Sequence, residues 1–361
     1  MARRQERNHG CRISDQFTLN GLKLVVMENE LLRVSSFLDK GTDIFEFLYK
    51  PRDVDFMWRS PLGLPSAAKI TRALPSGVGP FLDSYLGGWQ EVLPNGGFPS
   101  AYKGAELALH DETPLLPWNC VILEDSPDKV VAQCWVRTRL TPFYLEKTFT
   151  LNSGEAVLAI EEELINEGEE EMELTWGHHV TLGEPFLDES CEVTVPAETV
   201  VTHPVEWSAG NRLLPGQRCS WPHVKGKNGE TIDLSRIPPK ESRSEDQAYL
   251  MDLREGWYAV TNRHRNVGFA LSWSQEVFPY LWFWQVYKGG FGYPWYGRTY
   301  NIGLEPFSSY PNTGLDGAIQ TGTQIRLRPG QNLRASLRAS VYEGLMQVRR
   351  VEPGEEIIPA A

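Results

Sequence analysis

The 361-residue sequence is poor in cysteine, and its few cysteines lie far apart. They number five, no two of them form a CxxC pair, and they stand at Cys11, Cys120, Cys134, Cys191 and Cys219. A disulfide framework or a structural zinc site usually shows an even number of cysteines or close spacing. We therefore expect reduced thiols, and neither a disulfide scaffold nor a cysteine-based zinc site.

Long apolar runs and an excess of positive charge are also missing. No window approaches the 18 apolar residues of a membrane span, and the basic start MARRQERNHG is not followed by the apolar stretch of a secretory signal. The formal net charge of −12 disfavours binding to nucleic acid or to an anionic membrane. We expect a cytoplasmic protein without nucleic-acid or membrane partners, in which residues 1–15 form a flexible N-terminal arm.

Motifs that bind nucleotides or metals are absent as well. The sequence has no P-loop, no GxSxG elbow, no HExxH, and no GxGxxG between a strand pattern and a helix pattern. Its histidines show no other metal-ligand spacing. The sequence therefore predicts no cofactor and no metal ion.

Alternation of apolar and polar residues is what the sequence has in abundance. It runs through 132–140 and 145–151 and returns at 22–34, 157–166, 258–273 and 325–341. A period of two is typical of half-buried strands. Helical periodicity is nearly absent, and the best candidate is a short turn around Pro239–Leu250. The pattern predicts an all-β protein with one large antiparallel β-sandwich over 16–345, few short helices, and a C-terminal tail at 346–361.

The segment 278–311 combines many aromatic residues with one carboxylate. We predict a first strand that carries Trp282 and Trp284, a glycine- and aromatic-rich loop at 288–298, and a second strand that ends at Glu305. The proline after Glu305 disfavours helix at that residue. The carboxylate is therefore expected at a strand end, beneath an aromatic loop.

The loop of this segment contributes Tyr293, Trp295 and Tyr296 to a chain that has 12 tryptophans. Flat aromatic faces pack well on the C–H faces of sugar rings, while a few polar groups fix the hydroxyls. A carbohydrate site is one interpretation. The other is a hydrophobic hairpin in the core of a β-protein, with Glu305 in solvent, and on the segment alone both stay open.

Three histidines stand near strand patterns. His178 and His179 are adjacent in LTWGHHVTLGEPF, and neighbouring residues of a strand face opposite sides, so only one of them can face a given pocket. His110 follows an apolar stretch. In LGGWQEVLPNGGFP, glycine pairs flank Gln90 and Asn95, whose amides could bind ligand hydroxyls or simply support a structural loop.

Taken together, four motifs resemble those of a known superfamily. GGWQEVLPNGG, His110, WGHHVTLGEPFL and NIGLEPFSSYP occur in the order seen in the aldose 1-epimerase (galactose mutarotase-like) superfamily, over roughly residues 20–345. The resemblance implies a large antiparallel β-supersandwich and a carbohydrate isomerase that interconverts the anomers of an aldose without a cofactor. It implies a small-molecule sugar as partner and leaves open whether the chain is a monomer or a homodimer.

The resemblance also implies site residues. Glu305 matches the general base, His179 the general acid with His178 as its near alternative, and His110 a sugar-binding histidine. The superfamily's N-terminal Asn-Arg motif is missing, and Gln90 and Asn95 stand in its region. The full set of substrate-binding candidates is His110, His178, Gln90, Asn95, Trp284, Gln285, Tyr293, Trp295 and Arg298.

The implied chemistry is ring opening by a base and an acid. Glu305 would take the proton of the anomeric hydroxyl while His179 protonates the ring oxygen. We expect an ionised Glu305 and a protonated His179 that attract each other across a pocket, a sugar ring apart. Two alternatives remain, a carbohydrate-binding β-sandwich without activity and a lyase-type reaction on a sugar derivative.

Overall fold

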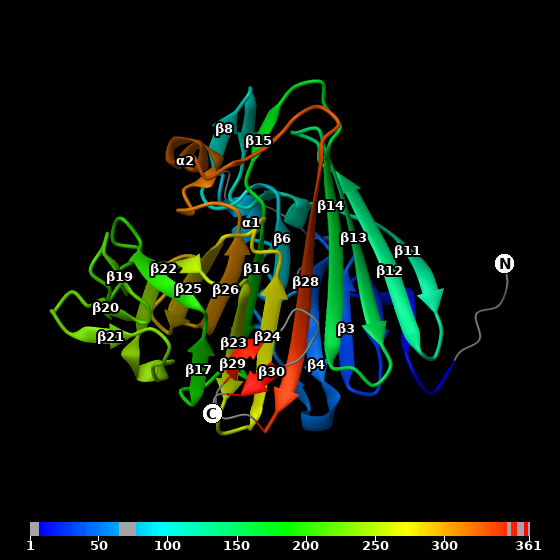
Figure 1. Ribbon diagram of the computed structural model, residues 1–361, viewed down its shortest axis with the longest axis horizontal. Coiled ribbons are helices and arrows are strands. Elements are labelled where there is room, and N and C mark those ends of the chain that lie inside the picture. Colours follow the sequence, from blue (N-terminus) through cyan, green and yellow to red (C-terminus); the bar gives the residue numbers. More distant parts are fainter. Residues whose placement is uncertain (1–6, 65–76, 345–347, 352–356, 360–361) are drawn as a thin grey trace.

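The computed structural model describes residues 7–64, 77–344, 348–351 and 357–359. Within them, two large antiparallel sheets face each other as the two layers of a sandwich (Figure 1). The apolar core lies between the sheets and draws side chains from both of them. The structure thus confirms the prediction of an all-β fold with few short helices.

The larger sheet has twelve strands. In spatial order they are β1 (Arg12–Leu19), β2 (Leu22–Glu28), β3 (Leu32–Phe37), β4 (Asp43–Tyr49), β6 (Trp89–Val92), β16 (Gly177–Gly183), β26 (Tyr300–Phe307), β25 (Tyr280–Tyr287), β22 (Ser244–Leu253), β18 (Ala197–Thr202) and β19 (Arg218–Ser220), with β5 (Val54–Asp55) paired to β4. The centre of this sheet brings together strands that are more than 200 residues apart in the chain, since β6 and β26 both pair with β16.

The smaller sheet has eight strands. They are β11 (Asn119–Asp125), β12 (Lys129–Arg137), β13 (Phe143–Asn152), β14 (Val157–Asn166), β28 (Asn332–Glu343), β24 (Val267–Trp273), β23 (Trp257–Asn262) and β17 (Cys191–Thr194). Burial alternates strictly along β13, where Phe143, Leu145, Phe149 and Leu151 point into the core. The sequence alternation therefore reports the two faces of this sheet directly.

Short elements decorate the two sheets. The two-stranded pairs are β7 (Pro94–Asn95) with β10 (Asp111–Glu112), β8 (Ser100–Tyr102) with β9 (Ala105–Leu107), β15 (Met172–Leu174) with β27 (Ile325–Leu327), β20 (His223–Lys225) with β21 (Thr231–Asp233), and β29 (Val348–Val351) with β30 (Ile357–Pro359). The helices are α1 (Gly79–Leu82) and α2 (Gly314–Thr321), and the 3-10 turns are η1 (Lys50–Arg52), η3 (Thr113–Leu115) and η4 (Lys240–Ser242). No helix of the described residues is long and apolar enough to cross a membrane.

Two local predictions are wrong. The helical turn expected around Pro239–Leu250 is limited to η4, because the residues from Ser244 onward pair with β25 as strand β22. Glu305 lies inside β26 rather than at a strand end. Pro306 is tolerated there because the paired register between β16 and β26 stops at Gly303 and resumes at Phe307, so no ladder bond needs its missing N–H.

Strand β1 begins at Arg12, so it reaches into the segment 1–15 that we predicted as a flexible arm. Residues 1–6 of that segment lie outside the described residues. The predicted tail, 346–361, contains the strands β29 and β30, which pair with each other.

The sandwich core generates a stability prediction. Leu337 of β28 is fully buried, whereas Leu123 of β11, in the same sheet, is 56% exposed. Leu337→Ala should lower the free energy of unfolding by about 2–5 kcal/mol, because it removes apolar contacts and leaves a cavity. Leu123→Ala should change it by less than about 0.5 kcal/mol. Urea denaturation of both variants measures the difference, and equal effects would contradict the assignment of the core.

Candidate active site

A cavity of about 170 Å³ opens on the face of the twelve-stranded sheet that points away from the smaller sheet. Its polar lining is His110, His179, Glu245, Gln247, Glu305 and Asn312. Its aromatic lining includes Phe81, Tyr85, Trp207, Trp282, Trp284 and Trp295. The sequence-predicted residues that the structure brings together here are Glu305, His179, His110, Trp284 and Trp295.

Strand alternation puts the central residues on one face. Glu305 of β26, His179 of β16 and Trp284 of β25 line the cavity, whereas their chain neighbours Leu304 and Val180 belong to the sandwich core. Because side chains alternate along each strand and these three strands are adjacent, the outward positions converge on a single spot. The sheet itself therefore fixes the positions of Glu305 and His179.

His179 and Glu305 form a buried imidazole–carboxyl contact in this cavity. The Nε2 atom of His179 lies 3.5 Å from Oε1 of Glu305, and the two residues are only 5% and 3% exposed. Gly303 makes room for the carboxylate, since a Cβ atom at that position would stand 2.3 Å from Oε1. We expected the pair to be a sugar ring apart. The closer spacing still suits the chemistry, because the anomeric and ring oxygens of a sugar are bonded to the same carbon.

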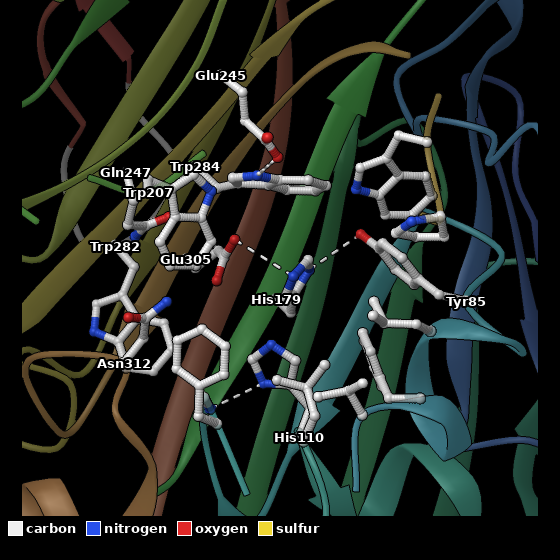
Figure 2. A pocket seen from close by; sticks show the side chains of 18 residues that line it. Tyr85, His110, His179, Trp207, Glu245, Gln247, Trp282, Trp284, Glu305 and Asn312 are labelled. Atoms are coloured by element: carbon white, nitrogen blue, oxygen red, sulfur yellow. Dashed lines mark hydrogen bonds and ion pairs between the residues drawn. The ribbon is translucent and has the colours of Figure 1, made fainter. Parts of the chain in front are cut away.

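A chain of hydrogen bonds determines which nitrogen of His179 carries a proton. The Thr181 hydroxyl donates to the carbonyl of Gly88 at 2.6 Å, so its oxygen accepts from the Tyr85 hydroxyl at 3.1 Å. The Tyr85 oxygen is then left to accept from Nδ1–H of His179 at 3.2 Å. Figure 2 shows His179 between Tyr85 and Glu305. In neutral His179 the lone pair of Nε2 therefore faces Glu305.

His110 has the opposite tautomer. The backbone N–H of Gly97 donates to Nδ1 of His110 at 3.2 Å, which leaves Nε2 to carry the proton when the ring is neutral. Burial lowers the pKa of His110 well below its ordinary value, with a smaller contribution from nearby His179. Its ring centre lies 5.1 Å from that of His179. His110 therefore offers a neutral hydrogen-bond donor beside the pair.

Burial also sets the charge of the pair. It raises the pKa of Glu305 well above its ordinary value and lowers the pKa of His179 to about 3. Both shifts favour the neutral groups, in contrast to the ion pair that we expected from their attraction. The neutral pair and the ion pair hold the same single proton, on Glu305 in one case and on Nε2 of His179 in the other.

Several lining residues were missed by the sequence reasoning. Glu245 and Gln247 lie on β22, in the stretch that we predicted as a helical turn, and the Glu245 carboxylate accepts from the Trp284 indole at 3.5 Å. Ala248 and Leu250 belong to the sandwich core on the opposite face of β22, and this short alternation was the available signal. Tyr85 lies in an irregular segment that carries no such signal.

His178 faces the core and not the cavity. The indole N–H of Trp89 donates to Nδ1 of His178 at 3.1 Å, so Nε2 carries the proton toward Glu162, also at 3.1 Å. Burial lowers the pKa of His178 to about 4 and raises that of Glu162 to about 7. Both ring nitrogens are engaged within the protein. We therefore leave His178 out of the proposed site.

The same internal network contains a group that has the composition of a metal site. Glu91, Glu162 and His178 place ligand atoms within 4.8 Å of one another. Lys147 forms an ion pair with Glu91 at 2.6 Å, and the Trp176 indole donates to Glu91 at 2.9 Å. A lysine charge lies against Glu91 and a protonated Nε2 of His178 faces Glu162, and neither favours a bound cation. We interpret it as a structural network behind the cavity.

The remaining predicted residues also lie outside the cavity. Asn95 donates to the carbonyls of Phe98 and Ala108 and accepts from the Leu315 amide, and Gln90 donates to Gly87. Gln285 faces inward by alternation and accepts from Arg212, Tyr293 donates to Asp83, and Arg298 donates to the carbonyls of Trp295 and Pro294. These five side chains support the loops and strands around the cavity rather than line it.

The buried pair predicts a pH dependence of stability. A raised Glu305 pKa favours the folded state at low pH and loses this effect as the pH rises above the unfolded value of 4.5. A lowered His179 pKa does the opposite, since its effect is lost as the pH falls from 6.5 toward about 3. The two slopes cancel between pH 4.5 and 6.5, and above 6.5 only the Glu305 slope remains.

The double variant His179→Gln/Glu305→Gln removes both titrations and provides the reference. The unfolding free energy of the wild type, minus that of the double variant, should be flat from pH 5 to 6 and fall by up to ~1.4 kcal/mol per pH unit above pH 7. Urea denaturation across this range measures it. A difference that rises from pH 5 to 6 and stays flat above pH 7 would show that the folded protein holds the pair without the shared proton.

Comparisons with known proteins identify the fold. A search of curated proteins finds no match. Among solved structures, a candidate aldose 1-epimerase from Klebsiella pneumoniae has a TM-score of 0.71 at 15% identity, over 94% of this chain and 85% of that one. A galactose mutarotase-like protein from Clostridium acetobutylicum has a TM-score of 0.62 at 13% identity, over 93% and 99%. A second candidate aldose 1-epimerase, from Escherichia coli K12, has a TM-score of 0.60 at 15% identity, over 90% and 100%.

These likenesses confirm the predicted galactose mutarotase-like fold. They are likenesses of fold, since all three identities are below 25%. A family described as a domain of unknown function, DUF4432, matches residues 19–341, and the chain belongs to that family.

Proposed function

We propose that the protein is an aldose 1-epimerase-like isomerase, which interconverts the anomers of a sugar by opening and closing its ring. The observation that carries the proposal is the His179–Glu305 pair. The two side chains lie 3.5 Å apart, are nearly inaccessible to solvent, and line a cavity with aromatic walls. Solved structures with this fold include proteins described as candidate aldose 1-epimerases, which supports the same chemistry.

Ring opening needs one proton removed and one proton supplied at neighbouring oxygens. The Glu305 carboxylate takes the proton of the anomeric hydroxyl, and the electron pair of the broken O–H bond forms the C1=O bond. The C1–ring-oxygen bond breaks as Nε2–H of His179 protonates the ring oxygen. The open aldehyde then rotates about its C1–C2 bond, and the two groups reverse the step to close either anomer.

The proton count of the pair suits this cycle. The reactive state is the ion pair, and ring opening converts it to protonated Glu305 and neutral His179. Burial favours that neutral state. The hydroxyl and ring oxygen of a bound sugar would in turn stabilise the ion pair by hydrogen bonds to its charged groups. The resting and reactive states thus differ only in the position of one proton.

The other lining residues would hold the sugar. Trp282 and Trp284 extend from β25 into the cavity and can pack on the C–H face of a pyranose. The Nε2–H of His110 and the amide of Gln247 can bind hydroxyls. Positioning of the ring against the pair is what converts two ordinary proton transfers into one concerted event.

Loss of the base gives the first test. Glu305→Gln keeps the size of the side chain and removes the proton acceptor, so the acceleration of anomer exchange should fall by about 10²–10⁴-fold. Exchange NMR across a panel of free aldoses measures the rate. Glu163→Gln, on the exposed face of β14, is the matched control and should retain full activity. A Glu305→Gln protein that accelerates exchange as much as the wild type would reject Glu305 as the base, whereas a wild type that accelerates no exchange would support a carbohydrate-binding protein in which Glu305 only hydrogen-bonds.

Tyr85 is a positioning residue in this proposal. Tyr85→Phe removes the acceptor of Nδ1–H of His179 and leaves that group without its buried partner. The turnover number should fall by roughly tenfold, with KM nearly unchanged, because the loss acts on the acid rather than on sugar binding. The pH–rate profile of the variant should also shift. An effect confined to KM would assign Tyr85 to sugar binding instead.

A further inference from the structure

The proposed function fixes how a pyranose must lie along the cavity, and this inference rests on it. Glu305 faces the anomeric hydroxyl and His179 faces the ring oxygen. The ring oxygen joins C1 to C5, whereas C2 is attached to C1 on the other side. The C5 substituent therefore extends beyond His179, and the hydroxyls of C2 and C3 lie on the Glu305 side.

The cavity is apolar on the His179 side. The ring centres of Tyr85 and Phe81 lie 5.2 and 5.9 Å from that of His179, and Leu82 and Leu109 pack against the same aromatic cluster. The Tyr85 hydroxyl is already engaged by Thr181 and His179. The Nε2–H of His110, whose ring centre lies 4.8 Å from that of Phe81, is a donor beside this wall, and the proposed function assigns it to a ring hydroxyl. Phe81, Leu82 and Leu109 themselves offer a C6 hydroxyl no partner in place of its water.

The cavity is polar on the Glu305 side. Gln247 and Asn312 lie on that side in Figure 2, opposite Tyr85, and Glu245 lies above Trp284. Their amides and carboxylate can bind several hydroxyls at once. The two ends of the cavity thus match the two ends of a sugar that is hydroxylated near C1 and apolar beyond C5.

The charge of the cavity lining disfavours anionic substrates. The described residues that line the cavity include two carboxylates, Glu305 and Glu245, and no lysine or arginine. Burial raises the pKa of Glu245, which indicates a site that does not stabilise added negative charge. A phosphate, carboxylate or sulfonate at C6 would therefore enter an acidic, apolar cavity without a counterion.

We propose that the substrate is a 6-deoxyaldohexose, whose C5 carries a methyl group in place of a hydroxymethyl group. The methyl group lies against Phe81, Leu82 and Leu109, beyond His179. A pocket of this kind discriminates against an added hydroxyl by about 10–100-fold. The preference concerns binding as well as turnover, so it can be measured even where the reaction is blocked.

The first experiment compares sugars that differ only at C6. Exchange NMR gives kcat/KM for 6-deoxy-D-glucose against D-glucose, 6-deoxy-D-galactose against D-galactose, 6-deoxy-L-galactose against L-galactose, and 6-deoxy-L-mannose against L-mannose, with D-glucose 6-phosphate as the anionic probe. In the pair that reacts fastest, the 6-deoxy sugar should exceed its partner by about 10–100-fold. Equal or reversed values in that pair, or preference for the phosphate, would overturn the inference.

A binding experiment separates this inference from the proposed function. The same sugars are titrated against Glu305→Gln protein by tryptophan fluorescence, since Trp207, Trp282, Trp284 and Trp295 line the cavity. Preferred binding of 6-deoxy sugars without any wild-type exchange would retain the inference and reject the isomerase. Exchange without the 6-deoxy preference would do the reverse, and neither binding nor exchange with any sugar would reject both.

A pair of variants tests the wall itself. Leu109→Asn has nearly the shape of leucine but offers an amide, so the ratio of kcat/KM for the 6-deoxy sugar over its hydroxymethyl partner should fall by roughly tenfold. Leu109→Met keeps the wall apolar and should leave the ratio unchanged. If both variants change the ratio alike, Leu109 acts through packing alone and the proposed contact with C6 is wrong.

Discussion

A buried carboxyl group and a buried imidazole in contact share one proton, and the rest of the site depends on that constraint. Water is nearly excluded from Glu305 and His179, so neither group is easily charged alone. Strand alternation brings them to the same face, Gly303 leaves space for the carboxylate, and Tyr85 orients the imidazole. Each of these features holds the two groups in contact, as the proposed proton transfers require.

The two adjacent histidines of β16 differ in how many of their ring nitrogens are engaged within the protein. His178 faces inward, where Trp89 and Glu162 use both of its ring nitrogens. His179 faces outward, where only Nδ1 is used by Tyr85 and Nε2 is directed at Glu305. A histidine with one committed nitrogen is a defined proton carrier, whereas one with two is a fixed support. The inner network therefore stabilises the strand that carries His179.

The sequence was sufficient for most strands, because a period of two reports sheet faces directly. His179 and Glu305 came from the resemblance of four motifs to the superfamily, and the structure places them 3.5 Å apart. The sequence was insufficient where function depends on loops. Asn95 resembles a ligand-binding amide, but its side-chain N–H groups donate to the backbone carbonyls of Phe98 and Ala108. Tyr85 lies in an irregular segment, and no local pattern shows that it reaches His179. Glu245 was missed because a proline-rich polar stretch before β22 suggested a turn.

The tautomer of His179 is the most direct test of this account, because every step assigned to the pair depends on which nitrogen holds the proton. A long-range proton–nitrogen NMR spectrum of histidine-labelled protein, with His179→Gln for assignment, reports the state of both ring nitrogens. The account predicts a neutral ring with the proton on Nδ1 from pH 5 to 8, as expected from a pKa of about 3 and the Tyr85 acceptor. A ring that titrates near pH 6.5, or a neutral ring protonated on Nε2, would contradict it.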